Sequence, residues 1–417
     1  MNVLLKKVTI ISASSPFHRQ VKDILIIDGI IKEINDSVEH RDAQIISGRD
    51  MHVSIGWMDI FADFGEPGNE HKETLETGAA AAAAGGFTDV MLMPDTPNPV
   101  SAKDRVAFLI QRSASLAVNI HPIGTVTKNA EGTELAEMYD MHSSGAVAFG
   151  DGRKTIQQSG IILKGLQYLA AKEAVLIQVP DDTSISAGGL MNEGVESTRL
   201  GLPGNPAIAE ELMVARDISL LGYTDSKLHI SGLSTKKSLD LVTAAKKQGL
   251  NLTCSVTPYH LFFCDEDLSD YHTNLKVNPP LRTREDMKAL QDGFKKGLID
   301  CIASHHAPQC SDDKVCEFEY AKNGMIGLQT LYGAVNGFAD EDLFIKMLTE
   351  NPRNIFGLEL PRIEEGAAAC LTLYEPGTEY IFEENMILSG SKNSPFIGKK
   401  LKGKPVGIIN ENRMLLN

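Results

Sequence analysis

Residues 56–68, with the sequence GWMDIFADFGEPG, constrain the fold of this chain more than any other segment. The first half alternates its side chains as a β-strand does, and the strand stops at Gly65, before the turn Glu66-Pro67-Gly68. Residues 71–84 then predict a helix, which closes with a run of alanines before two glycines. The chain therefore contains a strand–turn–helix unit with a carboxylate, Asp63, where the strand ends.

The same order of strand, loop and helix repeats as far as residue 303. The strands show little alternation, which is typical of strands that are buried on both faces. With the first strand they number eight, as a closed parallel barrel requires, so we predict an α/β fold of the TIM (β/α)8 type. The other predicted strands are 88–93, 120–126, 145–149, 174–179, 227–230, 252–256 and 300–303, and the helices between them are 104–111, 160–172, 206–218, 236–248 and 284–296.

Both ends of the chain predict short strands without intervening helices. Near the start, Asp28-Gly29 lies between two apolar runs, which is a strong hairpin signal. Strand patterns return near the end of the chain. We predict that residues 1–51 and 346–417 form one small composite β-sandwich beside a barrel spanning residues 52–345.

Composition excludes several classes of function. The formal net charge of −15 argues against nucleic acid and anionic membranes as partners. No apolar run approaches the roughly 20 residues of a membrane span, and the first residues lack the order of a signal peptide. The six cysteines form no Cys-x-x-Cys pair, so we expect reduced thiols in a cytoplasmic protein.

Seven motifs occur in one order along the chain, and together they are specific to one family. The first, EPGxxHKETxETG at 66–78, follows the first strand. The others are MPDTP at 93–97, MNEG at 191–194, LGLPG at 200–204, KVNPPLR at 276–282, GLQT at 327–330 and SKNSPF at 391–396. In these motifs the chain resembles a dihydroorotase of the amidohydrolase superfamily, of the type found in multifunctional complexes, and the resemblance covers nearly all of it.

The resemblance implies a hydrolase that opens cyclic amides with the help of zinc. A metal ion polarises the amide carbonyl and lowers the pKa of a bound water. In the family, imidazole and carboxylate ligands come from the ends of different strands, and an aspartate acts as general base. The resemblance also assigns substrate contacts to Asp95, Asn278 and Arg282, although Asp95 stands where the family has an asparagine.

Most positions that carry this chemistry in the family differ here. The His-x-His pair of the first strand is Phe61-x-Asp63, and the arginine that follows it is Gly65. The Asp-Asp-Gly of the fourth strand is Asp151-Gly152-Arg153, which keeps at most one carboxylate of the pair.

The later strands differ as well. The fifth-strand histidine is Val179, a sixth-strand histidine is Gly232, and the aspartate of the last strand is His305. Phenylalanine, valine and glycine side chains donate no lone pair, so these are not exchanges of one ligand for another. We predict no intact catalytic set, no metal ligands and no bound cofactor.

Three hypotheses about function remain open. The first is a catalytically inactive dihydroorotase-like protein of de novo pyrimidine biosynthesis. The resemblance implies the aspartate transcarbamoylase catalytic chain as its partner, and we also expect a homo-oligomer. The second is an active dihydroorotase, or a related cyclic amidohydrolase, with a rebuilt metal site. The third is a module that binds a small metabolite without turning it over. For the second, the candidate ligands are Asp63, Asp151 and His305, with Asp59 and His306 nearby.

Overall fold

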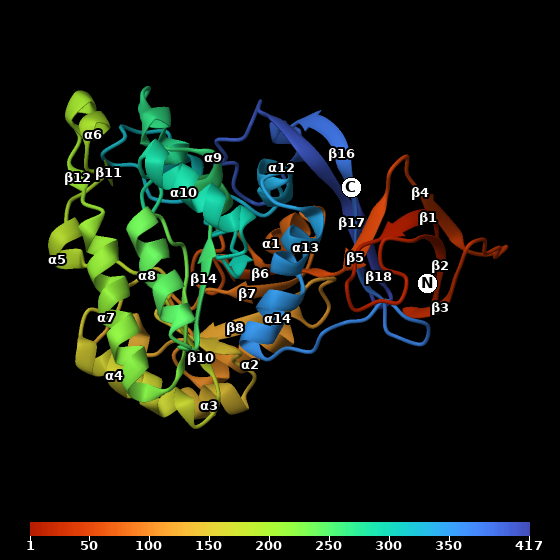
Figure 1. Ribbon diagram of the computed structural model, residues 1–417, viewed down its shortest axis with the longest axis horizontal. Coiled ribbons are helices and arrows are strands. Elements are labelled where there is room, and N and C mark those ends of the chain that lie inside the picture. The colour runs from red at the N-terminus through yellow and green to blue at the C-terminus, as the bar shows by residue number, and fades with distance from the viewer.

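The computed structural model describes residues 1–417 as a barrel flanked on one side by a smaller β domain (Figure 1). In the barrel, eight parallel strands each pair with the next one along the chain. The ring closes where Ala62 and His306 form a parallel bridge and the Asp63 N–H donates to the His306 carbonyl at 2.9 Å. The predicted TIM-type barrel is confirmed. Its strands are β6 (Trp57–Ala62), β7 (Phe87–Leu92), β8 (Asn119–Gly124), β9 (Ala148–Phe149), β10 (Val175–Gln178), β13 (Lys227–Ile230), β14 (Leu252–Val256) and β15 (Cys301–Ile302).

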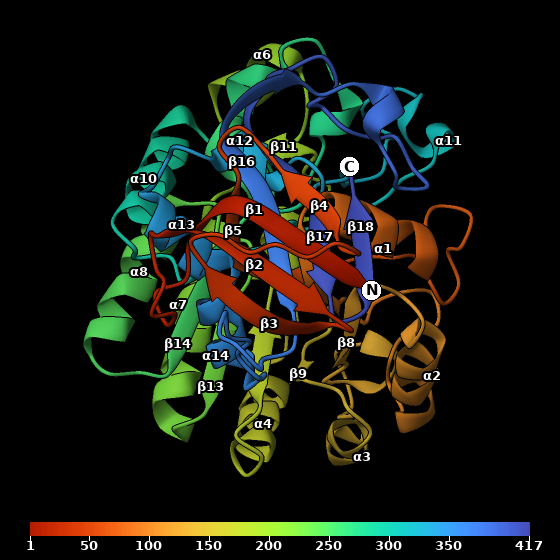
Figure 2. The same ribbon diagram turned by 90° about the vertical axis from the view of Figure 1, so that its right-hand side faces the viewer.

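Helices surround this ring (Figure 2). The longer ones are α1 (Leu75–Ala84), α2 (Lys103–Ser113), α4 (Ser159–Ala170), α7 (Ile208–Thr224), α8 (Lys236–Lys247), α10 (Arg284–Lys295), α13 (Glu341–Leu348) and α14 (Glu350–Phe356). Shorter elements complete the loops: η1 (Lys128–Ala130), α3 (Met138–Ser143), α5 (Thr183–Ser186), β11 (Met191–Asn192), α6 (Val195–Leu200), β12 (Gly204–Asn205), α9 (Pro258–Phe262), η2 (Asp265–Leu268), η3 (Thr273–Leu275), α11 (Ser311–Lys314), α12 (Leu331–Val335) and η4 (Glu384–Met386). No helix is both long and apolar enough to cross a bilayer.

The first barrel helix begins later than the sequence predicts. Helix α1 starts at Leu75 rather than at residue 71 because Thr74 caps it. The Thr74 hydroxyl accepts from the Thr77 N–H at 3.2 Å, and the Thr77 hydroxyl accepts from the Thr74 N–H at 3.0 Å. Glu73 is therefore left in the loop above the end of β6, where it contacts other loops.

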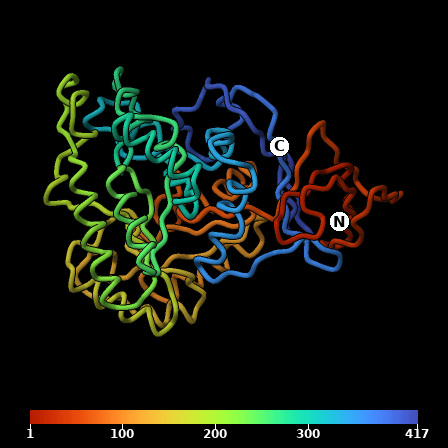
Figure 3. Tube along the Cα trace, in the orientation of Figure 1, coloured from red at the N-terminus to blue at the C-terminus, as the bar shows by residue number.

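The β domain is one sheet of eight strands drawn from both ends of the chain, which run side by side in the trace (Figure 3). Strand β5 pairs with β1 and with β16, so it lies in this sheet, and the barrel begins only at Trp57. At the other end α13 and α14 pack on β6, which extends the barrel past residue 345 to Phe356. The strands are β1 (Asn2–Ile10), β2 (Val21–Ile27), β3 (Ile30–Asn35), β4 (Gln44–Ser47), β5 (His52–Ile55), β16 (Cys370–Ile381), β17 (Lys400–Asn410) and β18 (Arg413–Leu416).

The interior of the barrel is filled by an apolar cluster. Its members include Met58, Met91, Ile177 and Cys301 from the strands, and Phe356 of α14 packs against them. This packing supports the mouth, which the loops at the carboxyl ends of the strands form.

Candidate functional site

The centre of the barrel mouth is occupied by an aromatic pair. Phe61, near the end of β6, is 1% exposed, and its ring lies 4.6 Å from the ring of His305, centroid to centroid, at a tilt of 37°. Val179, which follows β10, is buried in the same apolar cluster as Phe61. Two positions where the family resemblance implies histidine therefore lie in apolar packing.

His305 lies against Gly232. A Cβ added to Gly232 would stand 2.7 Å from His305 Cε1, so a side chain at position 232 and this ring exclude each other. The Nε2 atom of His305 is 2.9 Å from the Ser231 hydroxyl, and burial lowers the pKa of His305 to about 3. The imidazole is therefore neutral at neutral pH, and its Nε2 is already paired with the hydroxyl of Ser231, which directly follows β13.

Asp63 makes no hydrogen bond or ion pair with Asp151 or His305, but it forms an ion pair with Arg153. Its Oδ2 lies 3.0 Å from Nη2 of Arg153, whose Nε donates to Oδ2 of Asp95, also at 3.0 Å. Burial opposes the charge of Arg153, but attraction by Asp95 and Asp63 outweighs it and raises the pKa of the guanidinium above its usual value. The mouth thus contains an Asp63–Arg153–Asp95 triad.

Asp151 supports a neighbouring loop. Its Oδ1 accepts from the N–H groups of Val126 and Thr127, each at 3.0 Å, and its other oxygen accepts from the Thr127 hydroxyl. The side chain is 1% exposed, and burial raises the pKa of Asp151 to about 6 despite these donors. The structure brings Phe61 and His305 together, and Asp63 and Asp95, but it leaves Asp151 apart.

The two remaining substrate-binding candidates lie on the far side of the mouth. Arg282 is buried, and its guanidinium donates to the Ser234 hydroxyl at 3.0 Å, to Asn192 Oδ1 at 3.1 Å and to the Asn205 carbonyl at 2.8 Å. These bonds hold three loops together. Asn278 is half-buried and lies four residues before Arg282 in the chain.

The roles of Glu73 and Arg153 were not predicted from the sequence. Glu73 is 1% exposed and accepts from the hydroxyls of Ser389 and Thr77, from the Gly390 N–H at 2.8 Å and from His306 Nε2 at 3.3 Å. For Arg153 a signal was available: Asp63 and Asp95 stand at the ends of neighbouring strands without the family's histidines, so they require another cation. Three of the four Glu73 partners, Ser389, Gly390 and His306, lie more than 200 residues away along the chain, and the sequence offers no signal for them.

The zinc that the family resemblance implies does not fit this set of donors. In the whole chain no three side chains among His, Cys, Asp and Glu are arranged to hold a metal ion. The first-strand carboxylate, Asp63, is paired with the guanidinium of Arg153. The side chains of Phe61, Val179 and Gly232 supply no lone pair.

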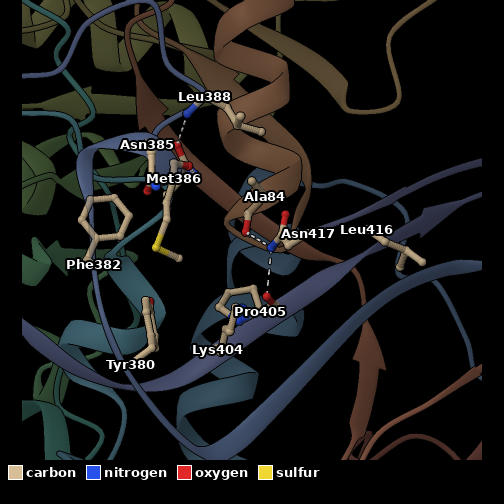
Figure 4. A pocket seen from close by; sticks show the side chains of 11 residues that line it. Ala84, Tyr380, Phe382, Asn385, Met386, Leu388, Lys404, Pro405, Leu416 and Asn417 are labelled. Atoms are coloured by element: carbon tan, nitrogen blue, oxygen red, sulfur yellow. Dashed lines mark hydrogen bonds between the residues drawn. The ribbon is translucent and has the colours of Figure 1, made fainter.

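An apolar cavity of about 350 Å³ lies away from the mouth, between α1, the β16–β17 pair and the end of the chain (Figure 4). Beside it, the Asn417 amide donates to the carbonyls of Ala84 at 2.8 Å and Pro405 at 2.9 Å. Tyr380 and Phe382 also line the cavity. None of the predicted site residues borders it.

Solved structures identify the class of the fold. The chain superposes on L-hydantoinase (dihydropyrimidinase) from Arthrobacter aurescens with a TM-score of 0.85, over 100% of this chain and 96% of that one, at 21% identity. It superposes on a D-hydantoinase with a TM-score of 0.81, over 100% and 95%, at 16% identity. These likenesses show the fold, a TIM-type barrel beside a β domain that is built from both ends of the chain.

Sequence comparison identifies the family. The model described as dihydro-orotase-like matches residues 52–238. The chain is 38% identical over 390 residues to the dihydroorotase of Acetivibrio thermocellus, covering 92% of each chain. It is 38% identical over 430 residues to that of Carboxydothermus hydrogenoformans, covering 100% of this chain and 99% of the other. This chain belongs to the dihydroorotase-like family, as the seven motifs predict.

Proposed function

We propose that this chain is a non-catalytic dihydroorotase-like protein that acts in de novo pyrimidine biosynthesis as a structural or regulatory partner. The observation that carries the proposal is the aromatic contact at the mouth, where the His305 ring packs at a tilt on Phe61 and excludes a side chain from position 232. A histidine at position 232 would need the space that the His305 ring fills, so changing Gly232 alone does not restore that ligand. Asp63 would also have to give up its ion pair with Arg153 before it could bind a metal ion.

The competing function is that of an active dihydroorotase with a rebuilt site. It is favoured by the names of the relatives, which are dihydroorotases at 35–40% identity over nine-tenths or more of this chain. Under this alternative, Asp63 would exchange Arg153 for a metal ion. It would then bind that ion with Asp151 and His305, which contact other groups in the structure.

Elemental analysis of the chain purified without chelators, with dihydroorotate hydrolysis assayed on the same sample, separates these functions. We expect less than stoichiometric zinc and manganese, and no turnover even after metal is added back. Stoichiometric metal with turnover would overturn the non-catalytic proposal. A relative such as the Acetivibrio thermocellus enzyme, treated in the same way, verifies the assay.

The aspartate transcarbamoylase catalytic chain is the partner we propose, on the basis of the family resemblance. Multi-angle light scattering of the two purified chains, alone and mixed, measures this directly. We expect a mixed species of higher mass, and a homo-oligomer when this chain is alone. If the two chains elute separately at micromolar concentrations, this partnership is excluded.

A further inference from the structure

The Asp63–Arg153–Asp95 triad places one cation between two carboxylates of the barrel mouth. The side chains of Asp63 and Asp95 are 9% and 5% exposed, and they come from the ends of β6 and β7. Arg153 follows β9 and reaches both: Nη2 contacts Asp63 and Nε contacts Asp95, while its backbone N–H also donates to Asp95 Oδ2 at 3.2 Å. One side chain thus joins the ends of three strands.

Two carboxylates this deeply buried require a cation between them. Each loses most of its hydration, and the attraction to a shared positive charge offsets that loss. A guanidinium suits the task better than an ammonium because its planar fork donates in two directions at once. The arrangement still leaves Asp95 Oδ1 buried without any hydrogen-bond partner, so the carboxylates offer more acceptor capacity than Arg153 fills.

Gly152 shows that the chain is built to bring these groups together. Its φ of +67° lies in the left-handed region, and a Cβ added to it would stand 2.3 Å from Asp95 Oδ1. Any other residue at 152 would displace Asp95 and with it the contact to Arg153. The replacement of one carboxylate in the fourth-strand motif by glycine therefore makes room for the triad.

We propose that Asp63 and Asp95 form a binding site for a planar cation of the guanidinium class, and that the chain's own Arg153 is its resident ligand. The site joins the loops after β6, β7 and β9 without any added metal ion. Removal of the Arg153 side chain opens it to a free alkylguanidinium. This inference goes beyond the proposed function, because it concerns what holds the mouth together whether or not the chain binds a partner.

Chemical rescue tests the site. Thermal unfolding of the Arg153→Ala variant is compared with that of Arg105→Ala, which removes a half-buried arginine that lines the same polar cavity as Asp95 and forms no ion pair. We expect Tm to fall by about 5 °C in the first variant and to change by less than about 1 °C in the second. Millimolar ethylguanidinium should restore at least half of the loss in a saturable way, and ethylammonium at the same concentration should restore less.

Three further measurements make the test decisive. Adding Asp63→Asn to Arg153→Ala should abolish the rescue, because one of the two acceptors is then lost. If Arg153→Ala does not fold, Arg153→Lys replaces it, and we expect a smaller loss of Tm that ethylguanidinium does not restore. The native chain should keep its Tm in EDTA and in manganese chloride.

Two results would overturn the proposal. One is equal stability of the Arg153→Ala and Arg105→Ala variants with no response to ethylguanidinium. The other is a saturable rise in the native Tm with manganese that Asp63→Asn abolishes, because it would show that a metal ion, and not Arg153, occupies the site.

Discussion

The rim and the centre of the barrel mouth have kept different parts of the family pattern. At the rim, Glu73 joins the loop before α1 to His306 and to the segment after η4. Each of its two carboxylate oxygens accepts two hydrogen bonds. At the centre, Phe61 and His305 pack as an aromatic pair. The loop residues at the rim therefore hold the fold together, whereas apolar packing fills the positions where the family resemblance implies metal ligands.

Removing the Glu73 hydrogen bonds at the rim should have the largest effect on the stability of the fold. Substitution Glu73→Ala leaves a buried imidazole, a backbone N–H and two hydroxyls without their shared acceptor, so we expect a loss of about 3 kcal/mol in the free energy of unfolding. Urea denaturation measures it. Glu70→Ala, in the same loop but exposed, is the control and should change the free energy by less than about 0.5 kcal/mol. Equal losses in the two variants would contradict the structural role of the rim.

A smaller effect is expected at the centre, from Gly232→Ala. Gly232 has φ of +73°, and the added methyl would also meet the His305 ring. Gly201, with φ of +67° and nothing within 4 Å of an added Cβ, is a matched control that carries the backbone cost alone. We expect about 1 kcal/mol for Gly201→Ala and about 2–3 kcal/mol for Gly232→Ala.

The difference in unfolding free energy between Gly232→Ala and Gly201→Ala measures the cost of the contact with the His305 ring. Combining Gly232→Ala with His305→Ala should remove that difference, because the methyl then enters the space that the imidazole leaves. If the excess cost of Gly232→Ala persists in the double variant, the contact with His305 does not explain it.

Much of the fold, and part of the centre of the mouth, could be predicted from the sequence. The eight strands follow from apolar runs at regular intervals, and it is plain from the sequence that the side chains of Phe61, Val179 and Gly232 offer a metal ion no lone pair. The contacts that fill the mouth could not be predicted, because they form across the barrel. Arg153 meets Asp63 from a strand end that lies 90 residues further along the chain, and nothing in the local sequence indicates which way its side chain turns. The boundary at residue 52 differs for a related reason, since β5 pairs with β16 near the other end of the chain.

The last effect, which is absent at neutral pH, concerns the protonation of the centre. In the unfolded chain a histidine gains its proton near pH 6.5, whereas burial lowers the pKa of His305 to about 3 in the folded chain. Between these values the unfolded state binds more protons, so the free energy of unfolding falls as the pH falls, by about 1.4 kcal/mol per pH unit for one such group. At neutral pH this contribution is absent.

Substitution His305→Asn should remove one such group and reduce that slope by about 1.4 kcal/mol per unit between about pH 6 and pH 4. Asparagine suits the test because it tolerates the φ of +44° found at this position and still presents polar atoms to Ser231. A remaining slope is expected, because burial also lowers the pKa values of His229 and His260 to about 3. Urea titrations across this range measure it. An unchanged slope would mean that His305 already carries a proton in the folded chain, which would contradict this prediction.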